Sequence, residues 1–259
     1  MYQFIKYEKS NGVATITINR PEVYNAVNDG VTYEMQDAFR QIGKDSEVRV
    51  VVLTGEGKAF CSGQDLKAIM GEEKDTFMNV MKKRYNPLIK LMRELPKPII
   101  GRINGVAAGA GCSLALACDI IVADEAAKFT EVFVNIGLVL DSGSSYFLPR
   151  IVGSHKAFEL SSMGSRITGK EALDMGIINK AVPADQLDEA VKSYTDYYAT
   201  APTLAIGLMK KMQSKSGHSS LDQMLEYEAL CQEIAGNSSD YQEGVSAFLE
   251  KRKAEFKGE

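Results

Sequence analysis

Residues 104–119 read Asn-Gly-Val-Ala-Ala-Gly-Ala-Gly-Cys-Ser-Leu-Ala-Leu-Ala-Cys-Asp, so a loop of small residues leads directly into an apolar segment. Gly109 and Gly111 flank Ala110 at the expected start of a buried helix, where a main-chain N–H is left without a partner. Such an amide is a good donor to a negatively charged oxygen. The same glycines also suit close packing of a helix against a strand, and these residues alone leave both readings open.

A second segment, residues 59–66, reads Ala-Phe-Cys-Ser-Gly-Gln-Asp-Leu and follows the turn Gly55–Gly57. Ser62 and Gly63 are small enough for a ligand to approach the backbone closely. The residues after them are expected to begin a helix whose first amides point outward. An ordinary strand-to-helix turn capped by Asp65 is an equally good reading of this segment alone.

The rest of the chain alternates between strand and helix patterns and predicts an α/β protein. From Gly153 onward it reads as about six helical segments, with one short strand near Asn179–Val182, and the catalytic half is expected to end near Arg150. Before that point we predict a hairpin of Phe4–Tyr7 with Val13–Ile18, helices over Val31–Ile42 and Phe77–Leu95, and strands over Val48–Thr54, Ile99–Ile103 and Ile120–Ala123.

Composition argues against several classes of protein. The net charge of −4 is spread along the 259 residues without a basic stripe, so we expect no nucleic-acid partner. No apolar run approaches the roughly 18 residues of a spanning helix and no targeting segment opens the chain, so we expect no membrane partner and a cytoplasmic location. The four cysteines and two histidines lack disulfide density or metal-ligand spacing, and no nicotinamide or flavin motif is present. We therefore expect neither a metal nor a cofactor.

Three motifs together have a low risk of a chance match. They are F-C-S-G-x-D-L from Phe60, N-G-x-A-x-G-x-G-x-x-L-x-x-x-C-D from Asn104, and G-L-x-x-D-x-G-x-x-x-x-L-P-R from Gly137. In these motifs the chain resembles the crotonase (enoyl-CoA hydratase/isomerase) superfamily. The resemblance implies a ClpP-like spiral of repeated ββα units over residues 1–190 with an acyl-CoA site, and a helical trimerisation region over residues 191–259. It also implies a homotrimer or homohexamer, with coenzyme A entering as part of the substrate.

The resemblance assigns roles to residues of the first two motifs. The main-chain amides of Gln64 and Ala110 would hold the thioester oxygen, and losing one such donor typically costs about 2.7–4 kcal/mol of transition-state stabilisation. Residues expected to contact the substrate are Asn25, Ala26, Ser62, Gly63, Asp65, Leu66, Gly109, Gly111, Ser113, Phe133 and Ile136.

The sequence departs from the hydratases of this superfamily, which use two glutamates to activate water. Those positions hold Ser113 and Phe133 here, and the remaining acid is Asp141. The residues alone fit Asp141 equally well as a general base or as a helix cap. In dienoyl-CoA and 1,2-epoxyphenylacetyl-CoA isomerases an Asp stands at this place, so the resemblance implies an isomerase with Asp141 as its acid and base.

Three alternatives to an isomerase are hydration, a dehalogenase-like reaction and acyl-CoA binding without turnover. Hydration would require a slipped alignment that makes Glu131 catalytic, which the Gly137 anchor opposes; otherwise Glu131 is a solvated or structural carboxylate. A dehalogenase-like reaction would recruit His and Trp partners, yet the chain has no Trp and no His before position 155. A non-catalytic acyl-CoA-binding homologue would keep the oxyanion fold without the acid.

Overall fold

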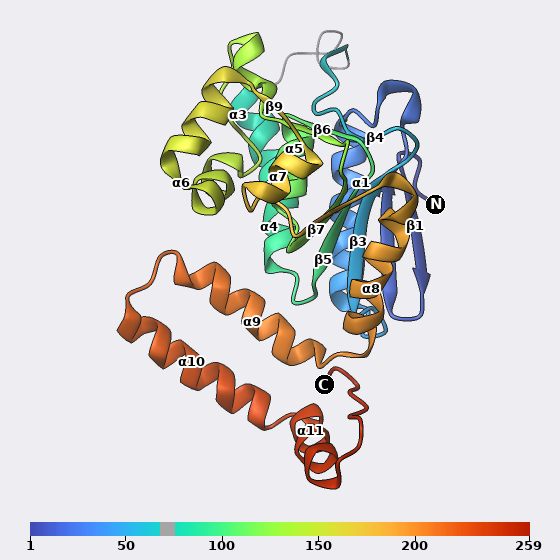
Figure 1. The fold of residues 1–259 in the computed structure, drawn as a ribbon, viewed down its shortest axis with the longest axis vertical. Coiled ribbons are helices and arrows are strands. Elements are labelled where there is room, and N and C mark those ends of the chain that lie inside the picture. Colours follow the sequence, from blue (N-terminus) through green and yellow to red (C-terminus); the bar gives the residue numbers. More distant parts are fainter. Residues whose placement is uncertain (68–75) are drawn as a thin grey trace.

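The computed structural model describes residues 1–67 and 76–259, and its core is a six-stranded sheet (Figure 1). The predicted hairpin is confirmed, because β1 and β2 pair antiparallel with Ser10 opposite Val13, and all other pairs in this sheet are parallel. In spatial order the strands are β1 (Ile5–Ser10), β2 (Val13–Ile18), β3 (Val50–Gly55), β5 (Ile99–Ile103), β7 (Ile120–Asp124) and β10 (Lys180–Val182).

A second, four-stranded sheet is built from strands of three residues each. Its order is β4 (Ala59–Cys61), β6 (Val106–Ala108), β8 (Lys128–Thr130) and β9 (Arg166–Thr168). The pairs β3 and β4, β5 and β6, and β7 and β8 each place one strand in the large sheet and the next in the small one. This recurrence is the ββα spiral that the family resemblance implied, and each turn places its two strands beside those of the turn before.

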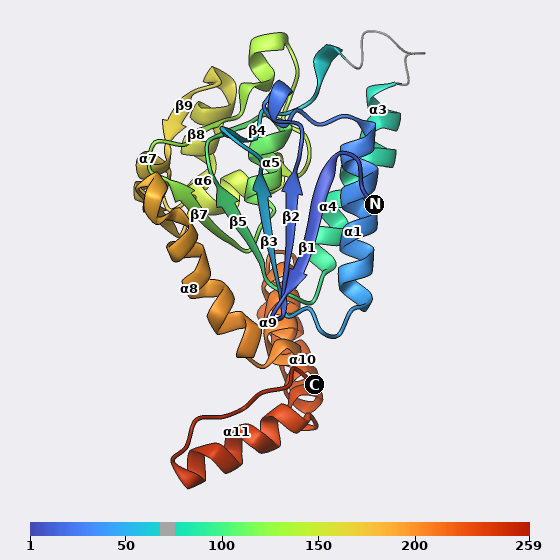
Figure 2. The same ribbon diagram turned by 90° about the vertical axis from the view of Figure 1, so that its right-hand side faces the viewer.

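Helices cover both faces of the large sheet (Figure 2). On β3, Val51 and Leu53 pack into the core that α1 (Asp29–Lys44) and α4 (Asn86–Glu94) complete, while Val50 and Val52 face the helix α8 (Leu187–Thr200). Both faces of this strand are therefore buried, which accounts for its unbroken β-branched run.

The remaining helical segments lie at the ends of the strands. The predicted helix over Phe77–Leu95 is continuous but contains one wide π turn, η2 (Met81–Tyr85), between α3 (Phe77–Val80) and α4. The other segments are η1 (Pro21–Val23), α5 (Ala110–Leu116), η3 (Val132–Ile136), α6 (Ser144–Met163), α7 (Gly169–Asp174) and η4 (Ala184–Gln186).

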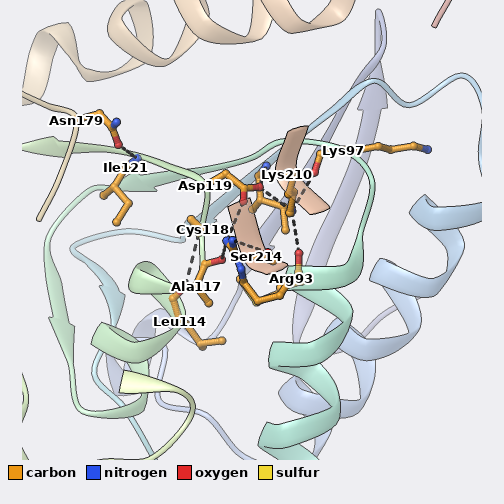
Figure 3. Close-up of polar contacts among 12 residues, drawn as sticks. Arg93, Lys97, Leu114, Ala117, Cys118, Asp119, Ile121, Asn179, Lys210 and Ser214 are labelled. Atoms are coloured by element: carbon orange, nitrogen blue, oxygen red, sulfur yellow. Dashed lines mark hydrogen bonds and ion pairs between the residues drawn. The ribbon is translucent and has the colours of Figure 1, made fainter. Parts of the chain in front are cut away.

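The last three helices, α9 (Thr203–Ser216), α10 (Leu221–Gly236) and α11 (Ser239–Glu250), extend away from the sheets (Figure 1). The boundary predicted at residue 190 falls inside α8, whose Leu187 and Val191 pack on the large sheet. Only α9 of the last three reaches into the core, where Lys210 pairs with Asp119 at 2.7 Å (Figure 3). In the part of the chain that the structure describes, no helix combines the length and apolar character needed to cross a membrane.

Candidate active site

A cavity of about 440 Å³ opens where the ends of β4, β6 and β8 meet, within the usual size range of small-molecule sites. Asp141 is the only ionisable side chain among the described residues that line it. The lining residues are Ser62, Gly63, Gln64, Leu66, Phe77, Val80, Met81, Gly109, Ala110, Val132, Phe133, Ile136, Leu138 and Asp141. The described part of the cavity wall is therefore mostly apolar, with a single carboxyl group.

The Gly-rich loop sets the position of the Ala110 amide. Gly109 has φ +51° and ψ −125°, and α5 begins at the next residue, so Ala110 is its first residue. A side chain on Gly111 would place its Cβ 2.2 Å from the carbonyl oxygen of Cys61. The packing reading is confirmed at Gly111, which permits close approach to β4. Gly109 permits the turn that places Ala110 in the cavity lining, and the role of the Ala110 amide as an oxyanion donor stays a prediction.

The Gln64 amide is presented by a parallel bridge between Gln64 and Val27. The bridge uses the carbonyl of Gly63 and the amide of Asp65, which bond to Val27 at 2.7 and 2.8 Å. The N–H of Gln64 therefore points to the opposite side. Outside the regular ladders, no main-chain hydrogen bond of the described residues occupies the amide of Gln64 or of Ala110.

Close approach of the two loops brings these amides together. Gly63 has φ +95°, and a Cβ there would lie 2.7 Å from the oxygen of Ala108 and 3.6 Å from the nitrogen of Ala110. The Gln64 side chain is fixed as well, because it donates to the Val27 carbonyl at 2.9 Å and accepts from the buried Tyr85 hydroxyl. The geometry can hold one oxygen between two main-chain donors.

Asp141 lies in the loop before α6, with a half-buried side chain. Burial raises the pKa of this carboxyl above its ordinary value, and the hydrogen bond from the Ser142 hydroxyl at 2.8 Å partly opposes that rise. The helix-cap reading of Asp141 is wrong, because the N-cap of α6 is Gly143 and no side chain caps it. The Asp141 carboxylate is free to face the cavity.

The two positions that hold glutamates in hydratases have different surroundings here. Phe133 lies on η3 and lines the cavity. Ser113, which we expected to contact the substrate, is fully buried behind Asp141, and its hydroxyl lies 3.1 Å from the Asp141 carbonyl oxygen. The structure therefore does not bring Ser113 to the described lining of the cavity.

Four other predicted contact residues also lie outside that lining. Asn25 is fully buried and donates to the carbonyls of Glu56 and Ala59. Arg20 pairs with Asp65 at 2.9 Å and donates to the Ala26 carbonyl at 2.6 Å. Gly111 packs against β4 as described above. These contacts hold the loop that carries Gln64, and any contact of these four residues with coenzyme A stays a prediction.

Sequence reasoning missed part of the apolar wall. Phe77, Val80 and Met81 come from the segment before α4, and Val132 and Leu138 flank the Phe133 position. Helix-spaced apolar residues in the segment were the available signal, but such spacing does not distinguish a core face from a cavity wall. Residues 68–75 lie outside the described residues, and part of the helix expected after Asp65 falls there.

Glu131 proves to be neither solvated nor part of the cavity lining. It is 3% exposed, and burial raises its pKa to about 7.

Within residues 1–67 and 76–259, no group of three or more side chains of metal-ligating type gathers in one place.

Comparison with known proteins identifies the family. The enoyl-CoA hydratase/isomerase family model matches residues 8–259. Over its full length the chain is 39% identical to the 1,2-epoxyphenylacetyl-CoA isomerase of Escherichia coli (strain K12), covering 100% of both chains. It is also 39% identical to a "probable enoyl-CoA hydratase" of Rhodobacter capsulatus, covering 99% of each.

Comparison with solved structures points to the same family. The enoyl-CoA hydratase of Bacillus anthracis matches with a TM-score of 0.94 and 32% identity, covering 99% of this chain and 100% of that one. The enoyl-CoA hydratase of Mycobacterium smegmatis matches with a TM-score of 0.92 and 30% identity, covering 98% and 99%. The chain therefore belongs to the enoyl-CoA hydratase/isomerase family, in the crotonase superfamily, and has the crotonase fold.

Proposed function

We propose that this protein is an acyl-CoA isomerase that shifts a double bond, or rearranges a ring, through a thioester enolate. One observation carries the proposal: an apolar cavity contains two main-chain donors, from Gln64 and Ala110, and Asp141 as the only ionisable residue of its described lining. A single carboxyl can take up and return one proton, which is all that such an isomerisation requires.

The reaction follows from these groups. The Asp141 carboxylate removes the α-proton of a β,γ-unsaturated thioester, and the C–H electron pair moves into the conjugated system and onto the thioester oxygen. The amides of Gln64 and Ala110 stabilise that charge where it develops. The same carboxyl returns the proton at the γ-carbon, the electrons leave the oxygen, and the product is the α,β-unsaturated thioester.

The acyl group is proposed to be unsaturated or aromatic. Phe77, Phe133 and Ile136 supply an apolar wall that suits such a group and keeps water from the enolate. The Escherichia coli relative is named as the isomerase of an epoxyphenylacetyl thioester, a ring substrate of this kind. A role in phenylacetate degradation rests on that likeness.

Hydration is the second candidate, favoured by the hydratase names among the relatives. Addition of water needs a second acid-base group near the double bond. Ser113 and Phe133 stand where the hydratase glutamates would be, and Glu131 lies outside the described cavity lining. We therefore expect hydration to be weak.

A binding protein without turnover is the third candidate, and the position of Asp141 in the cavity lining argues against it.

The test is a paired assay of hydration of crotonyl-CoA and of double-bond migration in a β,γ-enoyl-CoA. Asp141→Asn should lower isomerisation about 10²–10⁴-fold, because the amide cannot accept the proton. Acyl-CoA binding should persist in the variant. The matched control is Asp174→Asn, an exposed aspartate on α7, which should leave both rates unchanged.

Other outcomes separate the candidates. Strong hydration that survives Asp141→Asn would contradict the proposal and favour a hydratase. Tight acyl-CoA binding without turnover in the wild type would favour the binding protein.

A further inference from the structure

Glu131 is a buried carboxyl group that the reaction above does not use. It lies between β8 and η3, next to a cavity of about 20 Å³ whose walls are mostly apolar, including Leu116, Phe129 and Leu148. Its Oε2 atom is buried and has no hydrogen-bond partner among the described residues. An ionised carboxylate in such a place is costly, so the site favours the neutral acid.

The other carboxyl oxygen begins a chain of hydrogen bonds that ends at Asp141. Glu131 Oε1 is hydrogen bonded to the Ser144 hydroxyl. The Ser144 Oγ lies 3.2 Å from the Ser113 Oγ. The Ser113 Oγ lies 3.1 Å from the main-chain oxygen of Asp141 and 3.3 Å from that of Gly109, so Asp141 is the nearer of its two main-chain acceptors. Ser113 and Ser144 are fully buried. The chain therefore connects Glu131 to the backbone of the proposed catalytic residue without crossing the substrate cavity.

The number of donor hydrogens on Glu131 and the two serines determines the direction in which these hydrogen bonds run. Each serine hydroxyl carries one hydrogen. If Glu131 is protonated, it donates to Ser144, Ser144 donates to Ser113, and Ser113 donates to the Asp141 carbonyl, so every link is filled. If Glu131 is ionised, it accepts the Ser144 hydrogen. The single Ser113 hydrogen must then go to Ser144, to Asp141 or to the Gly109 carbonyl, so the link to Ser144 or the link to Asp141 is lost.

The hydrogen bond from Ser113 to the Asp141 carbonyl attaches to a turn with an unfavourable backbone conformation. The Ser144 amide donates to the Asp141 oxygen at 3.0 Å, closing a turn over Ser142 and Gly143, whose φ angles are +51° and +88°. A non-glycine residue with positive φ costs about 1–3 kcal/mol and persists only where its surroundings hold it. The Asp141 carbonyl is the point where both the turn and the serine chain attach.

We propose that Glu131 is held as a neutral carboxylic acid and is a positioning residue that fixes, through Ser144 and Ser113, the turn that aims Asp141. Its effect on turnover rests on the proposed function, but its protonation does not.

Burial supports the neutral form and raises the pKa of Glu131 to about 7, against the opposing effect of hydrogen bonds with Ser144 and the Cys112 thiol. The titratable groups that face it among the described residues are Cys112 of α5 and Asp141. Burial also raises the pKa of the Cys112 thiol, so the thiol is uncharged, and the negative charge of Asp141 further disfavours ionisation of Glu131.

Infrared difference spectroscopy tests the protonation without any assay of activity. The carbonyl-stretch band of a buried, protonated carboxylic acid should be present in the wild type at pH about 6. It should disappear in Glu131→Gln and remain in Glu228→Gln, an exposed glutamate on α10. If the two variants give the same spectrum as the wild type, Glu131 is ionised and the inference is wrong.

Kinetics test the positioning. Glu131→Met removes the donor at similar volume and should lower kcat for isomerisation about tenfold, less than the roughly 100-fold that a 1 Å misplacement can cost, with little change in KM. Glu131→Gln keeps an N–H donor for Ser144 and should restore most of that loss. Equal kcat values in the Met and Gln variants would overturn the positioning role.

Two further readouts separate positioning from mere packing. In the wild type kcat should fall as the pH rises through about 7, the pKa of Glu131, whereas Glu131→Gln should lose this alkaline limb. Ser113→Ala breaks the last link while leaving Glu131 intact, should lower kcat similarly, and serves if Glu131→Met does not fold. An alkaline limb that persists in Glu131→Gln would contradict the inference. Activity that survives Asp141→Asn would overturn the proposed function, while the infrared result would still stand.

Discussion

The affinity of the Asp141 carboxyl for its proton should set the acidic side of the activity profile. Burial raises its pKa above the ordinary value of 3.8, and a general base must be ionised to accept a proton. Isomerisation should therefore be lost as the pH falls through a midpoint that is higher than 3.8. The measurement is kcat/KM for a β,γ-enoyl-CoA against pH, which reports the free enzyme.

Ser142 provides the matched variant for this prediction. Its hydroxyl donates to the Asp141 carboxylate at 2.8 Å and favours the charged form. Ser142→Ala should therefore raise the Asp141 pKa further and move the acidic limb to higher pH. An acidic limb that stays in place in Ser142→Ala would mean that another group controls it.

At the residue scale, the sequence motifs predicted two main-chain positions that line the cavity, Gln64 and Ala110, and their roles as donors stay predictions. Gln64 and Ala110 were placed by motifs whose glycines have a steric reason, since a Cβ at Gly63 or Gly111 would collide with a carbonyl oxygen. The behaviour of Ser113 and Glu131 was not predictable from spacing, because both are polar residues whose burial depends on how α5, η3 and α6 pack. No local pattern marks a carboxyl group that is buried behind a site.

At the element scale, the long strands, the amphipathic helices and the short strand β10 were predicted, and the short strands of the second sheet were not. β4, β6, β8 and β9 have three residues each, too few for alternation to be visible. β4, β6 and β8 form because each follows a long strand that the core fixes in place, whereas β9 follows α6 and pairs antiparallel with β8. The π turn at η2 was likewise hidden inside a normal helical pattern, which carries one extra residue without losing its apolar face.

The attachment of α9 to the core makes a prediction about stability. Lys210 is buried, pairs with Asp119 at 2.7 Å and donates to the carbonyls of Met92 and Lys97 (Figure 3). Asp119→Ala would leave the Lys210 ammonium without its counter-charge, which should cost about 3–5 kcal/mol of unfolding free energy. Lys210→Met replaces the buried charge with an apolar chain of similar length and should cost less. Denaturant unfolding at neutral pH measures both values.

An exposed ion pair is the control for that comparison. Lys192 pairs with Asp196 on the surface of α8, so Lys192→Met should change stability by no more than about 0.5 kcal/mol. If Asp119→Ala costs no more than Lys192→Met, the buried pair does not hold α9 to the core. If Lys210→Met costs as much as Asp119→Ala, the loss lies in the lysine contacts and not in an unpaired charge.

At the scale of the whole molecule, the C-terminal helices have too little of their own chain to pack against. α10 and α11 project from the sheets (Figure 1). Several of their large apolar side chains are exposed. These are Leu221, Leu225, Leu230, Ile234, Tyr241, Val245, Phe248 and Leu249. An exposed apolar surface of this kind typically marks an interface. Trimerisation through this region, which the family resemblance implies, would cover that surface.

We therefore expect the purified protein to sediment as a homotrimer or homohexamer. Phe248 and Leu249 are 80% and 74% exposed, so a charge at either position would be buried without a partner in an interface between copies. Phe248→Asp and Leu249→Asp should shift the sedimentation equilibrium towards the monomer, whereas Tyr197→Asp, at an exposed aromatic residue on α8, should not. Because the sheets and the cavity lie apart from α10 and α11, the far-ultraviolet circular dichroism of the two interface variants should stay close to that of the wild type. A wild-type protein that sediments as a monomer at micromolar concentration would show that these helices do not assemble the chain.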